Sequence, residues 1–351
     1  MILDLVLYAP NVHTGGGWVL LQALLNAWPD SVPMTAFLDG RARARLVLPL
    51  AARVSWVAPN VGSRLNAEFG LLRASRPGST VLCFHGLPPL LPNSSRVVVF
   101  QQNRNYLGLS PLSDFAWRTR LRLGFERFVS RAFRRRVSEY VVQTPAMQRA
   151  VAHWYRSESR KNDAPTVRVL PFIDALPATC QQSDPVRAWD FVYVSDGEAH
   201  KNHRALLAAW LLLAEAGLRP SLALTLGPRD SALKSDVAIA AERSGVQIRD
   251  LGQVPRGEVM ALYANSRALI FPSKSESFGL PLVEAANMGL PIIAAELDYV
   301  RDVCIPVQTF DPDSPVSIAR AVRRFLSAPE PCVTLRTPTE FWNQLLSKDQ
   351  G

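Results

Sequence analysis

The chain has 351 residues, of which 48% are hydrophobic and 20% are charged, so it is long enough for about two domains of roughly 150 residues each. No segment approaches the ~18 consecutive apolar residues of a membrane-spanning helix. The four cysteines are scattered without a Cys-x-x-Cys pair, which disfavours a structural zinc site and suits a reducing cytoplasm. The opening MILDLVLYAP lacks a positive flank and a cleavage site, so we interpret it as a strand and not as a signal peptide.

The net charge of +9 is concentrated in one segment. Residues 115–136 read FAWRTRLRLGFERFVSRAFRRR and contain eight arginines against one glutamate. Most of the net positive charge therefore lies in this one segment. An anionic partner is expected to bind there and not over the whole surface.

The first part of the chain alternates short apolar runs with helical patterns. Continuous apolar, β-branched runs predict strands of a buried parallel sheet at 2–9, 81–85, 96–101 and 139–144. Apolar residues at helical spacing predict helices at 17–28 and 145–155. This alternation is typical of a doubly wound α/β domain.

A polar, proline-containing stretch near 175–188 predicts a domain linker, after which the α/β pattern restarts and continues to about residue 296. We expect a first domain at 1–176, a second at 185–330, and an amphipathic C-terminal helix at 336–351 that packs back toward the first domain. Two such domains are expected to face each other across a cleft, a common location for small-molecule sites.

The stretch SESFGLPLVEAANMGLP, residues 275–291, predicts a turn followed by a short helix. Gly279 permits an unusual backbone angle, Pro281 suits a helix start, and Gly289 suits a helix end. The N–H groups at the helix start form an anion site.

Glu276 precedes the turn at the carboxyl edge of the sheet, and Glu284 is expected in the first helical turn. Backbone donors for phosphate and two carboxylates for hydroxyl groups suit a sugar nucleotide. The alternative is that Glu284 only complements the helix dipole and Glu276 is solvated.

The segment ESFGLPLVE resembles the signature of the retaining, GT-B fold glycosyltransferases of family 4, also called glycosyl transferases group 1. The resemblance covers most of the chain and is best over residues 251–302. It implies two Rossmann-like domains, with Glu276 on the hydroxyls of the donor sugar and Glu284 on the ribose. The N–H groups of Phe278, Gly279 and Leu280 would face the sugar or the diphosphate. Val254 is a further donor-binding candidate.

The segment YVSDGEAHKNHRALLAAW resembles the start of the family's second domain, where a lysine pairs with the diphosphate. Lys201 is that lysine, and its charge would stabilise the leaving nucleoside diphosphate. Many members carry an arginine five positions earlier, where this chain has Asp196. Another cation replaces it, or the stabilisation rests more heavily on Lys201 and the helix dipole.

The loop NVHTGGGWVLLQALL in the first domain places three glycines between a strand and a helix. Gly16 and Gly17 are expected to touch the donor diphosphate or the acceptor, and tight packing between strand and helix is the alternative. The Gly-x-Gly pattern, with Asp39 further on, also fits the start of a dinucleotide fingerprint. Leu20 stands where the third glycine belongs, which disfavours a nicotinamide-dependent oxidoreductase.

Two histidines of the first domain are further candidates. His85 follows a predicted strand and occupies the position of the family's sugar-contacting histidine, so we favour a catalytic role for it beside Glu276 and Lys201. His13 is a weaker candidate of the same kind. Gln143 and Thr144 are interpreted as mostly structural.

An Asp-x-Asp pair, the metal motif of the other major glycosyltransferase fold, occurs at Asp311 and Asp313. Ser314 as a cap and Pro315 in the first turn predict a helix start there instead. No metal and no cofactor are therefore expected, with the nucleotide sugar as a substrate.

The arginine-rich segment 115–136 is predicted to be a helix. One face carries the large apolar residues Trp117, Leu121, Phe125, Phe128 and Ala132, and the arginines spread over the other faces. Part of this helix is expected to pack on its own domain. At about 1 kcal/mol per basic residue, the arginines are also expected to hold the protein on an anionic membrane surface. The membrane- or acceptor-side candidates are Arg118, Arg122, Arg131, Arg134 and Arg135.

These features predict a retaining, metal-independent glycosyltransferase. It would move a hexose or deoxyhexose, with mannose or rhamnose favoured, to a lipid-linked or saccharide acceptor in lipopolysaccharide or O-antigen synthesis. No general base is assigned, because in this family the donor phosphate is thought to help deprotonate the acceptor. The expected location is cytoplasmic, peripheral to the inner face of the cytoplasmic membrane.

The alternative is a non-catalytic basic α/β protein that binds nucleic acid or an anionic membrane. Nucleic acid is disfavoured, because no recognisable nucleic-acid-binding module accompanies the arginines.

Overall fold

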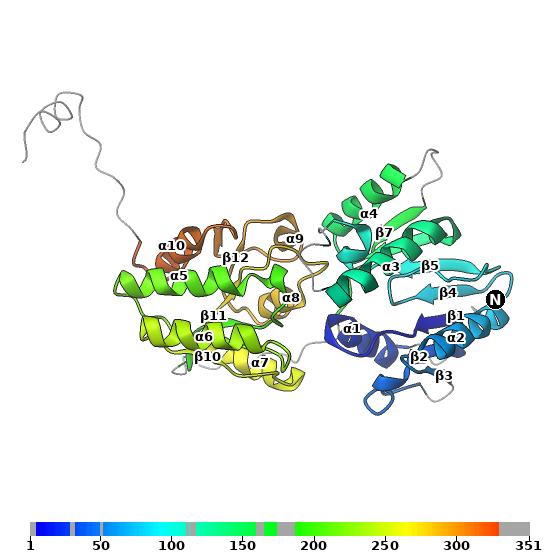
Figure 1. Cartoon of the computed structure of the whole chain (residues 1–351), viewed down its shortest axis with the longest axis horizontal. Helices are drawn as coiled ribbons and strands as arrows, with labels where there is room; N and C mark the ends of the chain where they lie inside the picture. Colours follow the sequence, from blue (N-terminus) through cyan, green and yellow to red (C-terminus); the bar gives the residue numbers. More distant parts are fainter. Residues whose placement is uncertain are drawn as a thin grey trace, which may run out of the picture.

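The computed structural model describes residues 5–28, 32–49, 52–109, 112, 117–158, 165–173 and 187–329. These residues form two parallel α/β domains that lie beside each other along the long axis of the molecule (Figure 1). The first domain runs from blue to green in the figure, and the second from green to orange.

The first domain is built on a parallel sheet, seven strands wide within the described residues, with the order β3-β2-β1-β4-β5-β6-β7. Its central strands are almost fully buried, as their continuous apolar runs predict. The strands are β1 (Leu5–Ala9), β2 (Met34–Asp39), β3 (Arg53–Val57), β4 (Thr80–Cys83), β5 (Arg96–Phe100), β6 (Glu139–Val142) and β7 (Thr166–Val169).

Helices cover both faces of this first sheet. The helices are α1 (Gly15–Asn26), α2 (Val61–Ala74), α3 (Trp117–Phe133) and α4 (Pro145–Glu158). The crossovers through α2, α3 and α4 step in one direction across the sheet, so right-handed connections place these helices on one face. The crossover through α1 steps the other way and places α1 on the opposite face. Separate apolar clusters under α1 and under α2 and α4 agree with this division.

The second domain has a parallel sheet of the same kind, six strands wide in its described part, with the order β10-β9-β8-β11-β12-β13. Its strands are β8 (Trp189–Tyr193), β9 (Leu222–Leu224), β10 (Ile248–Asp250), β11 (Ser266–Phe271), β12 (Ile292–Ala295) and β13 (Gln308–Phe310). The helices are α5 (His203–Glu215), α6 (Ser231–Ser244), α7 (Arg256–Ala264), α8 (Leu280–Asn287), α9 (Asp298–Arg301) and α10 (Pro315–Phe325).

The sequence did not reveal strands β2 and β3. Along the edge strand β3, RVSWV, exposed and half-buried side chains alternate up to the buried Val57, so this strand lacks a continuous apolar run. The predicted boundary at residues 176–185 lies within 174–186, outside the described residues, and so does the predicted helix at 336–351. No helix in the described part of the chain is both long enough and apolar enough to span a membrane.

Candidate functional site

The loop after β11 and the start of α8 have the geometry that their sequence predicts. Gly279 caps α8 with a φ of 74°, in the left-handed region that glycine adopts without strain, and Pro281 lies in the first turn. Gly289 follows the helix with a φ of 66°. One detail of the prediction was wrong: the helix begins at Leu280, so Glu284 opens the second turn and not the first.

Glu276 and Lys201 form an ion pair in this region. Lys201 Nζ donates to Glu276 Oε1 at 2.7 Å, and both side chains are mostly buried. The backbone fixes both partners: Lys274 N–H donates to the carbonyl of His200 at 2.8 Å, and Tyr193 Oη donates to the carbonyl of Lys201 at 2.8 Å. Two candidates 75 residues apart in sequence are thus held in direct contact.

Carboxylates surround the Lys201 ammonium. Burial lowers the pKa of Lys201, but the attraction of Glu276, Asp196 and Glu198 outweighs burial, and the net pKa lies above its usual value. Asp196, which stands where many relatives have arginine, is exposed. Arg122 of the first domain lies close enough to lower the pKa of Glu198, although burial and the neighbouring carboxylates keep that pKa raised. Arg122 therefore contributes positive charge near Glu198, while its own ion pair, at 3.8 Å, is with Glu126 of the same helix.

Glu284 is 4% exposed and has two partners. Arg256 Nη1 lies 2.9 Å from Glu284 Oε1, and Tyr263 Oη donates to Glu284 Oε2 at 3.3 Å. Burial raises the pKa of Glu284, and the contacts with Arg256 and Tyr263 oppose that rise. Val254, two residues before Arg256, packs against the apolar core of the second domain.

The two glycine candidates of the first domain lie in tight surroundings at the start of α1. A Cβ on Gly16 would come within 3.0 Å of Leu280 Cδ1, so the first turn of α1 approaches the first turn of α8 across the two domains. A Cβ on Gly17 would lie 3.2 Å from Gln102 Oε1. Gly16 therefore faces the candidate site, whereas Gly17 packs within its own domain.

The loop that carries Glu276 and Phe278 is attached to the first domain. Arg104 N–H donates to Ser277 Oγ at 3.2 Å, and Thr144 Oγ1 donates to the carbonyl of Ser277 at 3.4 Å. Phe278 is buried. A second attachment joins α4 to α9, where Ala146 N–H donates to Asp302 Oδ2 at 2.7 Å. The two domains are thus joined at two places, the loop between β11 and α8 and the end of α9.

The histidine candidates lie at the carboxyl edge of the first sheet. His85 Nδ1 is 3.3 Å from the carbonyl of Tyr8, and burial lowers its pKa to about 4, so the imidazole is neutral near pH 7. His13 Nδ1 is 3.4 Å from Asp39 Oδ2. Burial and the guanidinium of Arg41 lower the pKa of His13.

Helix α3 packs on its own domain in part, as predicted, but its face of large apolar residues is exposed. Its buried positions are Leu123, Glu126, Val129 and Ser130. Its large apolar residues on the other face are exposed to a similar degree: Trp117 at 64%, Leu121 at 68%, Phe125 at 62% and Phe128 at 62%. The arginine candidates of α3 and of the turn after it are Arg118, Arg122, Arg131, Arg134 and Arg135, of which Arg134 is half-buried and the others are exposed.

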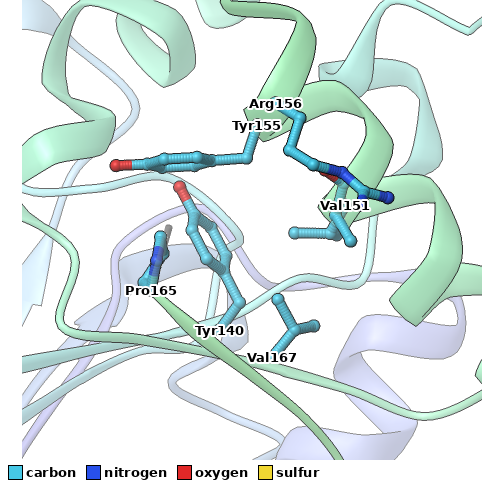
Figure 2. Close-up of a pocket in the computed structure, with 7 residues that line it drawn as sticks. Tyr140, Val151, Tyr155, Arg156, Pro165 and Val167 are labelled. Carbon is cyan, nitrogen blue, oxygen red and sulfur yellow. The ribbon is translucent and has the colours of Figure 1, made fainter. Parts of the chain in front are cut away.

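Two further features are the turn at Asp311 and Asp313, which contacts Lys274 and Asn202 beside the Lys201–Glu276 pair, and a small pocket in the first domain. Asp311 and Asp313 form the turn before α10, where Ser314 caps the helix by accepting from Ser317 N–H at 3.1 Å, so the predicted helix start is confirmed. A small pocket lies between α4 and the strands β6 and β7. Figure 2 shows Tyr140 beside Pro165 and Val167 with its hydroxyl directed toward Tyr155. This pocket is mainly apolar and contains none of the predicted site residues.

Sequence reasoning missed the partners of the predicted residues. Arg256 and Tyr263 bind Glu284, and Arg104 and Ser277 join the two domains. The stretch 251–302 contained the first pair, but no pattern tied either residue to Glu284. Thr144 was interpreted as structural and caps α4, but it also contacts Ser277.

The two sheets and the contact between α1 and α8 define the class, a GT-B fold, and solved structures agree. HepE from Anabaena, crystallised in complex with UDP and glucose, has a TM-score of 0.66 at 15% identity, covering 92% of this chain and 90% of HepE. The catalytic domain of starch synthase IV from Arabidopsis thaliana, bound to ADP and acarbose, has a TM-score of 0.64 at 14% identity, covering 99% and 96%. At these identities the likeness establishes the fold alone.

Sequence comparison identifies the family of the second domain. Residues 181–338 match the family model of the glycosyl transferases group 1, and this part of the chain belongs to that family. O-antigen chain mannosyltransferase B from Escherichia coli is 35% identical over 149 residues, which cover 39% of this chain. The match spans only 38% of the length of that relative.

Proposed function

We propose that this protein is a retaining, metal-independent glycosyltransferase that uses a nucleotide sugar. The observation that carries the proposal is the Lys201–Glu276 ion pair of 2.7 Å. It lies in the second domain, whose helix α8 starts within contact of Gly16 of the first domain. This arrangement offers an ammonium and backbone N–H groups to a diphosphate and a carboxylate to sugar hydroxyls. The nucleotide would bind mainly to the second domain, and the acceptor would bind to the first.

The proposed substrates follow from the relatives. The similarity to an O-antigen mannosyltransferase supports a mannose-like donor sugar, and a role in building a lipid-linked O-antigen or lipopolysaccharide saccharide. Asp311 and Asp313 are engaged in the start of α10, which leaves them poorly suited to hold a metal. We assign no protein residue as general base. We propose that neutral His85 contacts the donor sugar by a hydrogen bond.

A donor screen tests the proposal. The full-length protein is incubated with GDP-, UDP- and dTDP-sugars, and the thermal unfolding midpoint and the release of sugar are measured. One donor class is expected to raise the midpoint and to be hydrolysed slowly or transferred. Salt-sensitive binding of DNA or RNA, with no response to any nucleotide sugar, would contradict the proposal and favour the basic binding protein.

We further propose that the first domain docks on an anionic membrane surface. Helix α3 exposes an apolar stripe next to its arginines, and α2, on the same face of the sheet, exposes a second stripe. That second stripe consists of Val61 at 75%, Leu65 at 47%, Phe69 at 50% and Leu72 at 41%. Patches of exposed large apolar residues mark interaction sites, and a helix with aromatic and basic residues suits the bilayer interface.

Sedimentation with lipid vesicles tests the docking. The wild-type protein is expected to sediment with phosphatidylglycerol vesicles and to stay in solution with phosphatidylcholine vesicles. The double change Leu121→Gln and Phe125→Gln is expected to abolish sedimentation. Ile239→Gln is the control, because Ile239 is 53% exposed on α6 of the second domain. Equal sedimentation of the double variant and the wild type would contradict the docking.

A further inference from the structure

The carboxylate of Glu284 is occupied on both oxygens before any ligand binds. Arg256 contacts Oε1 and Tyr263 contacts Oε2, at 2.9 Å and 3.3 Å. A carboxylate offers about four acceptor positions, so these two donors leave about two of them free. A buried carboxylate without partners is costly, and the two donors hold this one in a fixed orientation.

Arg256 has a position that suits a ligand-binding role. It is the first residue of α7 and follows the loop at the carboxyl end of β10, the edge where ligands bind in α/β folds. Its side chain is one-third exposed, whereas the Nη2 atom is buried and has no hydrogen-bond partner among the described residues. A buried donor without an acceptor is unfavourable, so a bound molecule that supplies an acceptor to this N–H would remove that cost.

We infer that Arg256 is a positioning residue for the ribose of the nucleotide. This inference rests on the proposed function, in which Glu284 accepts hydrogen bonds from the ribose hydroxyls. Arg256 holds Oε1 so that the free acceptor positions of Glu284 face those hydroxyls, and Nη2 offers an N–H to an oxygen of the same nucleoside. Tyr263 fixes the other oxygen. The pair Arg256 and Tyr263 thereby selects nucleosides that carry ribose hydroxyls.

A comparison of two nucleotides tests the inference. The probe is the nucleoside diphosphate of the base that the donor screen selects, and it is compared with its 2′,3′-dideoxy analogue by calorimetry. The wild-type protein is expected to bind the hydroxyl-bearing form at least about tenfold more tightly. Arg256→Gln is expected to lose most of this preference, with a rise in the KM for the donor that exceeds any fall in kcat.

The matched control is Arg267→Gln. Arg267 forms an ion pair of the same length, 2.9 Å, with Asp190 in the same domain. This variant is expected to keep the full preference for the hydroxyl-bearing nucleotide. If Arg256→Gln folds and keeps the full preference, the inference is overturned and the ion pair is only structural.

Removing one partner of a buried ion pair is often strongly destabilising, so Arg256→Gln could fail to fold. A second pair of variants tests the inference in that case. Arg256→Lys keeps the charge but loses the planar fork, and it is expected to show a reduced preference. Tyr263→Phe removes the other donor and is expected to do the same. Full preference in both variants would also overturn the inference.

The outcomes for the wild-type protein separate the two claims. If no nucleoside diphosphate binds at all, the proposed function fails. If both nucleotides bind with equal affinity, the proposed function stands, and the assignment of Glu284 and Arg256 to the ribose fails.

Discussion

Lys201 Nζ lies 2.7 Å from Glu276 Oε1. The residue proposed to bind the diphosphate and the residue proposed to bind the sugar therefore contact each other in this structure. A bound diphosphate and the Glu276 carboxylate therefore compete for one ammonium. Glu276→Gln is expected to bind the nucleoside diphosphate more tightly than wild type, by roughly fivefold or about 1 kcal/mol. The same variant is expected to transfer sugar poorly, because a carboxylate accepts stronger hydrogen bonds from sugar hydroxyls than an amide does.

Calorimetric titration of both proteins with the diphosphate checks this prediction. A Glu276 that contacts only the sugar would leave the affinity for the diphosphate unchanged. Weaker binding by Glu276→Gln would contradict the competition directly.

Gly279→Ala is expected to destabilise the second domain by about 1–2 kcal/mol, because a residue with a side chain adopts the left-handed region at a cost. A Cβ there would also lie 3.1 Å from Leu282 Cδ1. The thermal unfolding midpoint measures the effect. Gly257→Ala in α7 is the control, since a Cβ at Gly257 has no neighbour within 4 Å and its φ is not positive. An equal midpoint for both variants would contradict the role given to Gly279.

Gly16→Val is expected to reduce sugar transfer while both domains stay folded, because its side chain would collide with Leu280 where α1 meets α8. The loss is expected mainly in the apparent affinity for the donor. Adding Leu280→Ala creates space and is expected to restore part of the activity. Steady-state kinetics of the single and double variants measure this coupling. If the double variant is no better than Gly16→Val, the contact between the domains does not matter for the reaction.

His203 predicts a pH-dependent stability. It is 3% exposed beside Tyr193, and burial lowers its pKa from 6.5 to about 4, with Asp196, Asp230 and Asp250 opposing the shift and Lys201 adding to it. The unfolded chain therefore binds a proton more readily than the folded protein. The stabilisation from a neutral His203 is complete above pH 6.5 and disappears as the pH falls toward 4.

Between pH 7 and pH 5 the free energy of unfolding is expected to fall by about 2 kcal/mol through this group. His203→Gln is expected to lose that part of the pH dependence, and His153→Gln on the exposed surface of α4 is expected to keep it. Urea unfolding at both pH values measures the difference. Identical pH dependence in His203→Gln and the wild type would contradict the prediction.

The sequence predicted the two α/β domains because a buried parallel sheet requires continuous apolar runs, as in Val97 to Val99. It predicted the turn at Gly279 because glycine followed by proline has local consequences for the backbone. It did not reveal β3, whose exposed edge position needs no apolar run. It did not reveal which face of α3 packs on the domain, since helical spacing identifies an apolar stripe but does not say whether protein or solvent lies against it.

The contacts of the site could be predicted only in part. The resemblance suggested Glu276 and Lys201 as candidates, but their mutual ion pair depends on how the loops after β8 and β11 meet in space. The same holds for Arg256 with Glu284, which lie on different helices, and for Thr144 with Ser277, which lie in different domains. Such pairs arise from tertiary packing, and no local pattern encodes them.

The most direct test of the central claim is sugar transfer, or donor hydrolysis, by Glu276→Ala with the donor that the screen selects. The control is Glu242→Ala, because Glu242 is an exposed residue of α6 in the same domain. We predict that Glu276→Ala stays folded at the assay temperature, with a lowered unfolding midpoint because Lys201 loses its partner, and loses transfer by at least about a hundredfold, whereas Glu242→Ala keeps full activity. Full activity in a folded Glu276→Ala protein would contradict the account.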